Sequence, residues 1–267
     1  MTKNKAIMIG AGLANMAAAV YLIQEGKWKG SQITFYSLDD HGSNDGSTAS
    51  EAADEYWNKT HPLENSEGFI ARGGRMLNYR TYVDLMDLLS RIPSATEQGM
   101  TAAEDTRDFD AKHRTFDKAR LMEGGKGIIN GGKLGLNNKD RMKLTELILM
   151  PDSKEEKLDN VTIADYFKDD PHMFTTNFWY MWETTFAFRV QSSAQELRRY
   201  MHQMIYEFTQ IEHLVGVNRT RYNQFESIML PLINYLKDQG VKIVLNRRVT
   251  NFEFKNTPMQ DLSLIHI

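Results

Sequence analysis

Hydrophobic and polar positions near the start of the chain follow the pattern of a strand, a tight turn and a helix. Residues 6–9 are apolar without interruption, which predicts a buried strand. This run breaks at Gly10 and Gly12 and gives way to the alanine-rich segment 13–19. A second run of β-forming residues follows at 32–36, so the order predicts a βαβ unit with parallel strands.

The glycine turn of this unit predicts a dinucleotide site. Gly10 permits the turn, and Gly12 lets a pyrophosphate approach the backbone at the N-terminus of the helix. The third glycine of the usual fingerprint is replaced by Asn15, so the motif is partial. An acidic residue usually ends the second strand and binds ribose, whereas Ser37 stands there and Asp39 follows. A Rossmann-like unit that binds no ligand is the alternative interpretation.

Helical periodicity dominates the middle of the chain. Apolar spacing predicts helices over residues 82–89, 139–150, 162–167, 177–188, 196–208 and 222–237. The charged and glycine-rich residues 97–137 are expected to form an irregular surface excursion. Two successive strands are expected at 240–245 and 248–254.

This order of elements predicts an α/β fold in which a Rossmann-like nucleotide domain is interrupted by a largely helical substrate domain. We assign residues 1–90 to the first part of the nucleotide domain and residues 91–238 to the helical insertion. Residues 239–261 are the expected return strands. Residues 262–267 resemble a translated adapter fragment, so we expect an N-terminal piece, truncated at the C-terminus, whose native sequence ends near Asp261.

Composition narrows the classes of function. The net charge of −3 argues against nucleic-acid binding through overall charge. The absence of cysteine excludes disulfides, zinc–thiolate sites and thiol nucleophiles, and it fits a reducing, cytoplasmic location. No apolar run is long enough to cross a bilayer, so membrane contact is expected to be peripheral at most. The histidine spacing matches no metal-ligand pattern, and we expect no metal site.

Six short motifs follow one another along the chain at residues 10–15, 41–46, 71–75, 177–179, 186–188 and 198–200. Together they resemble the fatty acid hydratases, the bacterial oleate and linoleate hydratases once called myosin-cross-reactive antigens. The resemblance covers nearly the whole chain up to about Asp261, and it is closest to the lactobacillus-type linoleate hydratases.

The resemblance implies a hydro-lyase that adds water across a cis double bond of free oleate or linoleate and gives a 10-hydroxy fatty acid. The reaction is redox-neutral, so the implied FAD would have a structural or electrostatic role. A homodimer and peripheral membrane contact through a further C-terminal part are also implied. The residues expected to contact FAD are Gly10, Gly12, Leu13, Ala14, Asn15, Ala17, Ser37, Asp39, Ser43, Arg72, Gly73, Gly74, Arg75, Met76 and Val249.

The resemblance also implies that Tyr200 is the proton donor. A phenol has a reference pKa of about 10, so it needs nearby positive charge, which Arg198 or Arg199 could supply. A half-buried helix tyrosine without a catalytic role is the structural alternative. Met76 occupies the position of the family's water-activating glutamate, and methionine cannot take a proton from water. We therefore expect another polar group, such as Asn78 or a backbone carbonyl, or attack of water on a developing carbocation without a strong base.

Two alternatives to a hydratase remain. The first is a flavin oxidoreductase of the amine-oxidase or desaturase type, which predicts that substrate bleaches the flavin and that an electron acceptor is consumed. The second is an inactive truncated fragment that binds lipid or FAD weakly. The aromatic residues at 177–188 are expected to form the core stripe of a helix, the wall of a long apolar pocket, or both, because such a helix can be core on one side and pocket on the other.

Overall fold

A computed structural model of the chain describes residues 5–38, 50–52, 69–71, 76–118, 121–207 and 210–252. Its contacts divide the chain into two compact units, each of which is described by itself. Unit 1 contains residues 1–76, 82–112 and 219–267. Unit 2 contains residues 77–81 and 113–218.

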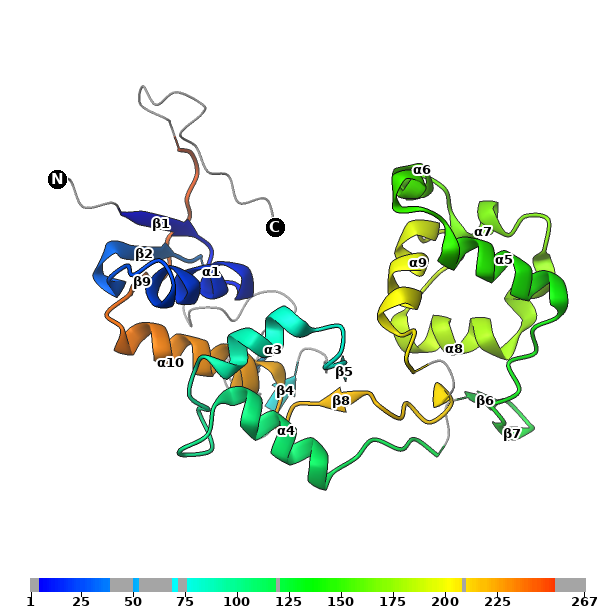
Figure 1. Ribbon diagram of the computed structural model, residues 1–267, viewed down its shortest axis with the longest axis horizontal. Helices are drawn as coiled ribbons and strands as arrows, with labels where there is room; N and C mark the ends of the chain where they lie inside the picture. The colour runs from blue at the N-terminus through cyan, green and yellow to red at the C-terminus, as the bar shows by residue number, and fades with distance from the viewer. Residues whose placement is uncertain are drawn as a thin grey trace, which may run out of the picture. The chain divides into compact units, whose positions relative to one another are not determined.

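The sheet of unit 1 contains the predicted βαβ unit and one further strand (Figure 1). Strands β1 (Ala6–Ile9) and β2 (Ile33–Tyr36) pair in parallel, and α1 (Leu13–Gln24) connects them. A short 3₁₀ turn, η1 (Gly30–Gln32), leads into β2. Strand β9 (Lys242–Val244) pairs in parallel with the other edge of β2. The predicted strand, turn, helix and second strand are therefore confirmed. The expected burial of the first strand is wrong for the described chain, because Ile7 and Ile9 are 68% and 50% exposed.

The second of the two expected return strands is wrong over its described part. β9 accounts for the first, but residues 248–252 form no strand. Val249 and Phe252 are 37% and 64% exposed, so the apolar residues that suggested a strand are not buried against a sheet in the described chain.

Four further helical segments lie in the described part of unit 1. They are α3 (Val83–Ser90), α4 (Ala102–Lys112), the π-helical segment η6 (Phe225–Met229) and α10 (Leu230–Asp238). Helix α10 packs on α1, whereas α4 packs on α3 and η6 (Figure 1). The backbone stays helical from η6 into α10, because Met229 and Leu230 both have αR dihedrals. The predicted 222–237 helix therefore forms as one helical run over residues 224–238, and its hydrogen-bonding pattern changes just before Pro231.

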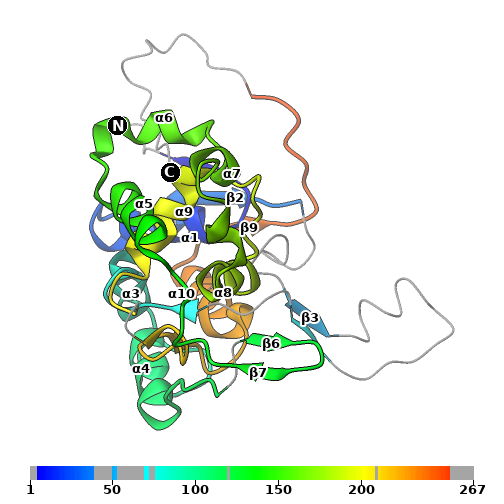
Figure 2. The ribbon, with the colours of Figure 1, turned by 90° about the vertical axis from the view of Figure 1, so that its right-hand side faces the viewer.

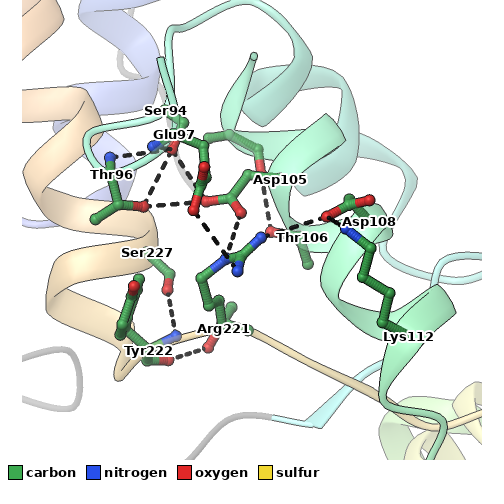
Figure 3. Close-up of polar contacts among 12 residues, drawn as sticks. Ser94, Thr96, Glu97, Asp105, Thr106, Asp108, Lys112, Arg221, Tyr222 and Ser227 are labelled. Carbon is green, nitrogen blue, oxygen red and sulfur yellow. Dashed lines mark hydrogen bonds and ion pairs between the residues drawn. The ribbon is translucent and has the colours of Figure 1, made fainter. Parts of the chain in front are cut away.

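Arg221, just before η6, contacts three carboxylates, two on α4 and one in the segment before it (Figure 3). Its Nε donates to Asp105 Oδ1 at 2.7 Å, and its Nη2 lies 3.4 Å from Asp108 Oδ2. Its Nη1 lies 3.6 Å from Glu97 Oε1. Asp105 is only 6% exposed, and its other oxygen accepts a hydrogen bond from Ser94 Oγ at 3.0 Å. The buried charge of α4 is therefore paired and hydrogen-bonded.

The expectation of an irregular excursion over residues 97–137 is wrong. Helix α4 lies within it, and β6 (Leu121–Glu123) and β7 (Gly127–Ile129) form an antiparallel hairpin (Figure 2). Asp105 and Asp110 are buried on α4, at positions where a helical pattern usually has apolar residues. Distant partners satisfy these carboxylates, so the local sequence pattern did not indicate the helix.

Unit 2 is mostly helical. Its helices are α5 (Asn138–Leu149), α6 (Glu155–Asp159), α7 (Ile163–Tyr166), α8 (Asn177–Phe186) and α9 (Ala194–Gln203), with 3₁₀ turns η3 (Asp152–Lys154) and η4 (Pro171–Thr175). Helix α9 contacts α5, α6 and α7. It ends at Gln203, short of the predicted 208, and continues as hydrogen-bonded turns.

The aromatic stripe of α8 forms the core of unit 2. Trp182 is fully buried, and its ring centroid lies 5.8 Å from Phe178, 5.0 Å from Phe186 and 6.2 Å from Phe188. Tyr180 is on the opposite side and 41% exposed. The core interpretation of this stripe is confirmed.

Two short pairs of strands involve the remaining described segments. β3 (Ser50–Ala52) pairs antiparallel with β4 (Phe69–Ala71). β5 (Met76–Leu77) pairs with β8 (Asn218–Arg219).

The boundaries of the two compact units differ from the boundaries of the predicted domains. The prediction placed 91–238 in one helical insertion, whereas the long segment of unit 2 is 113–218. The difference is the packing of α4, η6 and α10 within unit 1. The assignment of a substrate domain stays a prediction.

Candidate functional site

The turn between β1 and α1 is built around Gly10 and Asn15. Gly10 has φ +86°, which residues with a side chain rarely adopt, and its N–H donates to Tyr36 O at 2.8 Å. Asn15 Nδ2 donates to Ile9 O at 2.8 Å and to Gly10 O at 2.9 Å. The residue that replaces the third fingerprint glycine therefore braces the turn.

The space next to this turn is open. In the described chain, a Cβ added to Gly10 or Gly12 would meet no atom within 4 Å. Gly12 has φ −77°, so neither its backbone nor its packing within the described chain requires glycine. Helix α1 has no side-chain cap and no acidic residue in its first turn. An open approach to an uncapped helix N-terminus fits the pyrophosphate of a dinucleotide.

Three further predicted FAD contacts lie on α1. Leu13 is its first residue and is half-buried. Ala14 and Ala17 line an open, mostly apolar groove of about 550 Å³, together with Tyr21 and Leu22. The groove and the turn are both formed by residues near the N-terminus of the chain. The cofactor roles of these side chains stay predictions.

The remaining predicted FAD contacts provide less support for a cofactor site. Ser37 is 1% exposed; its N–H donates to Val244 O at 2.9 Å, and its carbonyl accepts from Arg247 N at 2.8 Å. Val249 lies in the irregular segment after β9. Met76 begins β5 and is half-buried. Outside the described residues lie Asp39, Ser43, Arg72, Gly73, Gly74 and Arg75.

Tyr200 is held on α9 by aromatic packing. Its ring lies edge-on to Phe186 and to Phe188, with centroids 5.3 Å apart in both cases. Ser193 caps the start of α9 by accepting from Gln195 N at 3.1 Å. The ring of Tyr200 is therefore fixed by the aromatic core, while the residue as a whole is only half-buried.

The two arginines before this tyrosine are paired with carboxylates. Arg198 is 4% exposed, and its Nη2 donates to Met150 O at 2.6 Å and to Asp152 Oδ1 at 2.8 Å. Arg199 Nε donates to Glu155 Oε1 at 2.7 Å and, as the largest cause, lowers the pKa of that carboxyl. The positive charge expected to assist the proton donor is largely neutralised by these pairs.

Asn78, which we considered as a replacement for the glutamate missing at position 76, is buried and engaged. Its Nδ2 donates to Gln203 O at 3.2 Å, and its Oδ1 accepts from Arg80 N at 3.0 Å. It also forms a side-chain hydrogen bond with Glu207. An amide cannot accept a proton from water at neutral pH. The group beside Asn78 that can do so is Glu207.

The sequence analysis missed Glu207. The residue is 5% exposed, and burial raises the pKa of its carboxyl, an effect that Arg80 and Asn78 partly oppose. It lines a cavity of about 300 Å³. Because its partner Asn78 lies far away in the sequence, no local pattern distinguished it from a surface glutamate near a helix end.

Asp140, at the start of α5, and Asp170, just before η4, form a pair of buried carboxyls. Asp140 is fully buried; its Oδ2 accepts from Asn137 N at 2.7 Å and lies 2.8 Å from His172 Nδ1. Asp170 is 3% exposed and hydrogen-bonds to Asp140. Burial, and then the neighbouring carboxyl, raise the pKa of Asp170, against the opposing charges of Lys139 and His172. Folding therefore shifts the balance of Asp170 towards its neutral form, compared with the unfolded chain.

The Asp170→Asn variant is expected to be more stable than the wild type at neutral pH. Because folding raises the pKa of Asp170, the stabilisation is complete below the ordinary aspartate value and is lost as pH rises through the raised value. An amide reproduces the neutral acid at every pH. Urea unfolding over about pH 4 to 8 checks this. The exposed Asp169→Asn is the control, and a wild-type pH slope in Asp170→Asn would contradict the assignment.

Among the described residues, no group of three or more histidine, aspartate or glutamate side chains is arranged to hold a metal ion. No helix in the described ranges is long and apolar enough to span a membrane.

A parallel βαβ unit with an open glycine turn defines an α/β fold of the nucleotide-binding class. The solved structure of a putrescine oxidase with bound putrescine has a similar fold, with a TM-score of 0.51. It is 14% identical and covers 91% of this chain and 51% of the oxidase, so the likeness concerns the fold alone. The chain belongs to the MCRA family, whose sequence profile matches residues 3–267. The resemblance inferred from the six motifs is thereby confirmed.

Two curated relatives carry hydratase names. A linoleate hydratase of Lactiplantibacillus plantarum is 77% identical over 261 residues, which are 98% of this chain and 46% of the relative. An oleate hydratase of Streptococcus pyogenes serotype M49 (strain NZ131) is 30% identical over 258 residues, or 96% of this chain and 40% of the relative. The chain thus spans about half the length of the curated relatives it matches.

Proposed function

We propose that the protein, at the full length of its relatives, is a fatty acid hydratase. It adds water across a cis double bond of free oleate or linoleate and gives a 10-hydroxy fatty acid. The observation that carries this proposal is the 77% identity to a linoleate hydratase over 98% of the chain. Homodimer formation and peripheral membrane contact stay predictions.

The glycine turn supports FAD as the cofactor of this activity. Gly10, Gly12 and the N-terminal N–H groups of α1 would hold the pyrophosphate, and Asn15 keeps the turn in shape. When bound, FAD would supply an electrostatic element of the site without exchanging electrons with the fatty acid.

Tyr200 is the proton donor in this proposal. Its O–H bond breaks as a C–H bond forms on one alkene carbon, and the oxygen of water forms a C–O bond to the other. Water then loses a proton, so the net reaction is alkene plus water to alcohol. Phe186 and Phe188 hold the phenol ring in place during the transfer.

Product analysis in water enriched in heavy oxygen tests the proposed function. The FAD-loaded protein, both as this chain and extended to the length of its relatives, is incubated with oleate or linoleate. Mass spectrometry should find a hydroxy fatty acid with one heavy oxygen. Substrate-dependent bleaching of the flavin with consumption of an electron acceptor would instead indicate an oxidoreductase. Absence of a hydroxy product from the extended protein would refute the proposal.

The Gly12→Ala variant is expected to bind FAD about tenfold more weakly or worse, equivalent to roughly 1.4 kcal/mol. The new methyl group would enter the open space above the turn, where the described protein itself has no atom within 4 Å. Stability should change by less than about 1 kcal/mol, because a less flexible unfolded chain and a poorer N-cap oppose each other. FAD titration by flavin fluorescence and a thermal melt without FAD measure the two effects.

Gly10→Ala is the matched comparison. Its φ of +86° should cost about 1–2 kcal/mol of stability even without FAD. If Gly12→Ala bound FAD as tightly as the wild type, the pyrophosphate would not lie against this glycine.

A further inference from the structure

The cavity beside Glu207 combines a buried carboxyl, whose Oε2 has no hydrogen-bond partner in the described chain, with many hydrogen-bonding groups. Its volume of about 300 Å³ leaves room for several water molecules, since each takes roughly 30 Å³ in the liquid. Besides Glu207, its polar lining includes Asn78, Arg80, Tyr206, Gln210 and Asn218. All of these residues belong to unit 2, so the cavity is a feature of that unit alone.

Glu207 differs from the structural carboxyls of the chain. Asp105 and Glu155 accept hydrogen bonds from arginines at 2.7 Å. Within the described ranges Glu207 has no ion pair, and its buried Oε2 has no hydrogen-bond partner. The nearby Arg80 is exposed, with its guanidinium 5.0 Å from the centre of the Tyr206 ring. A buried carboxyl without such pairing is costly, and such groups are concentrated at sites that use them.

The surroundings hold the carboxyl in one place. Asn78 hydrogen-bonds to it and is itself fixed by Gln203 O and Arg80 N. On another side lies Gly216, with φ +90°, where an added Cβ would stand 3.4 Å from Glu207 Oε1. The carboxyl is therefore positioned by contacts with segments on both sides of it.

Tyr200 and Glu207 lie on one continuous, hydrogen-bonded segment. Met204 N donates to Tyr200 O at 3.0 Å, and Glu207 N donates to Met204 O at 3.0 Å. Glu207 thus follows the proposed proton donor by seven residues, on the hydrogen-bonded turns that continue α9 beyond Gln203.

We propose that Glu207 is the proton acceptor for the attacking water, held in position by Asn78. This inference rests on the proposed hydratase function. As the oxygen of water forms the C–O bond, one of its O–H bonds breaks and the proton moves to the Glu207 carboxylate. The other alkene carbon takes the proton of Tyr200. Glu207 then releases its proton to solvent, and Tyr200 regains one, so both residues return to their starting states.

The proposal predicts the direction in which turnover changes with pH. Only the carboxylate form accepts a proton, so turnover falls as pH decreases through the pKa of Glu207, which burial raises. The other ionisable side chains that line the cavity are Tyr79, Arg80 and Tyr206. None of these is a carboxyl or a histidine. Loss of the acidic limb on removing the carboxyl would therefore assign that limb to Glu207.

The test uses Glu207→Gln in the FAD-loaded protein at the full length of its relatives. We expect kcat to fall about 100- to 10,000-fold, KM to change little and the acidic limb to disappear. FAD affinity should match the wild type, and Tm should not fall, because glutamine removes a charge that burial disfavours. Glu196→Gln, which removes an exposed carboxyl from α9, is the matched control and should keep the wild-type kcat and pH profile.

A second variant tests the role of Asn78 and does not depend on the folding of Glu207→Gln. Asn78→Asp places another carboxyl beside Glu207, so the acidic limb should move to higher pH. Wild-type kcat in Glu207→Gln, or an unmoved limb in folded Asn78→Asp, would overturn the inference. Failure of the hydratase proposal is distinguishable, because the wild type itself would then give no hydroxy fatty acid.

Discussion

Replacing Tyr200 by phenylalanine is expected to lower hydratase turnover about 100- to 10,000-fold in the full-length protein. The change removes only the phenolic oxygen, which carries the transferred proton in the proposed reaction. The ring contacts with Phe186 and Phe188, both at 5.3 Å between centroids, stay possible. Stability and FAD affinity should therefore be nearly unchanged. Steady-state hydration of oleate or linoleate, with a thermal melt on the same sample, measures both.

Tyr180→Phe is the control for this substitution. Tyr180 belongs to α8 in the same unit and is 41% exposed, so loss of its hydroxyl should leave turnover at the wild-type rate. If Tyr200→Phe also hydrated at the wild-type rate, the proton donor would have to be another group. An equal loss in both variants would show that the effect is not specific to the predicted donor.

Replacing Trp182 by alanine is expected to reduce the free energy of unfolding by about 3–5 kcal/mol. The indole is fully buried, and three phenylalanine rings surround it with centroids 5.0 to 6.2 Å away. Alanine would leave a cavity that these rigid rings cannot readily fill. Two of the same phenylalanines also position Tyr200, so turnover should fall as well.

Urea unfolding followed by circular dichroism measures this loss, because the signal does not depend on the deleted tryptophan. Tyr180→Ala truncates an exposed aromatic residue of the same helix and should cost less than about 0.5–1 kcal/mol. A loss below about 1 kcal/mol in Trp182→Ala would mean that α8 does not form the principal core of unit 2.

Elements whose stabilising contacts are local could be predicted from the sequence. The first strand, glycine turn and helix show the apolar run, the two glycines and the alanine-rich segment from which they were predicted. Thr162 caps α7 by accepting from Asp165 N, and threonine directly before an apolar run is a common N-cap. The aromatic spacing of α8 likewise matched its buried face.

Buried polar residues that depend on partners far away in the sequence could not be predicted. Helix α4 carries Asp105 on a buried side, and the arginine that pairs with it is residue 221, 116 positions away. Glu207 depends in the same way on Asn78, from a different part of the chain. In both cases a polar residue takes a buried position because a remote partner satisfies it, and hydrophobic periodicity contains no information about that partner.

The pairing of β2 with β9 also constrains how the protein is made. Thr34 lies opposite Lys242, so the ribosome adds Lys242, its partner, 208 residues later (242 − 34). At about 5–20 residues per second, β2 waits roughly 10 to 40 s for this partner. Most of unit 2 is synthesised within that interval and can fold first. Until β9 emerges, one edge of β2 presents unpaired backbone groups, which makes this strand a ready contact for chaperones or for a second nascent chain.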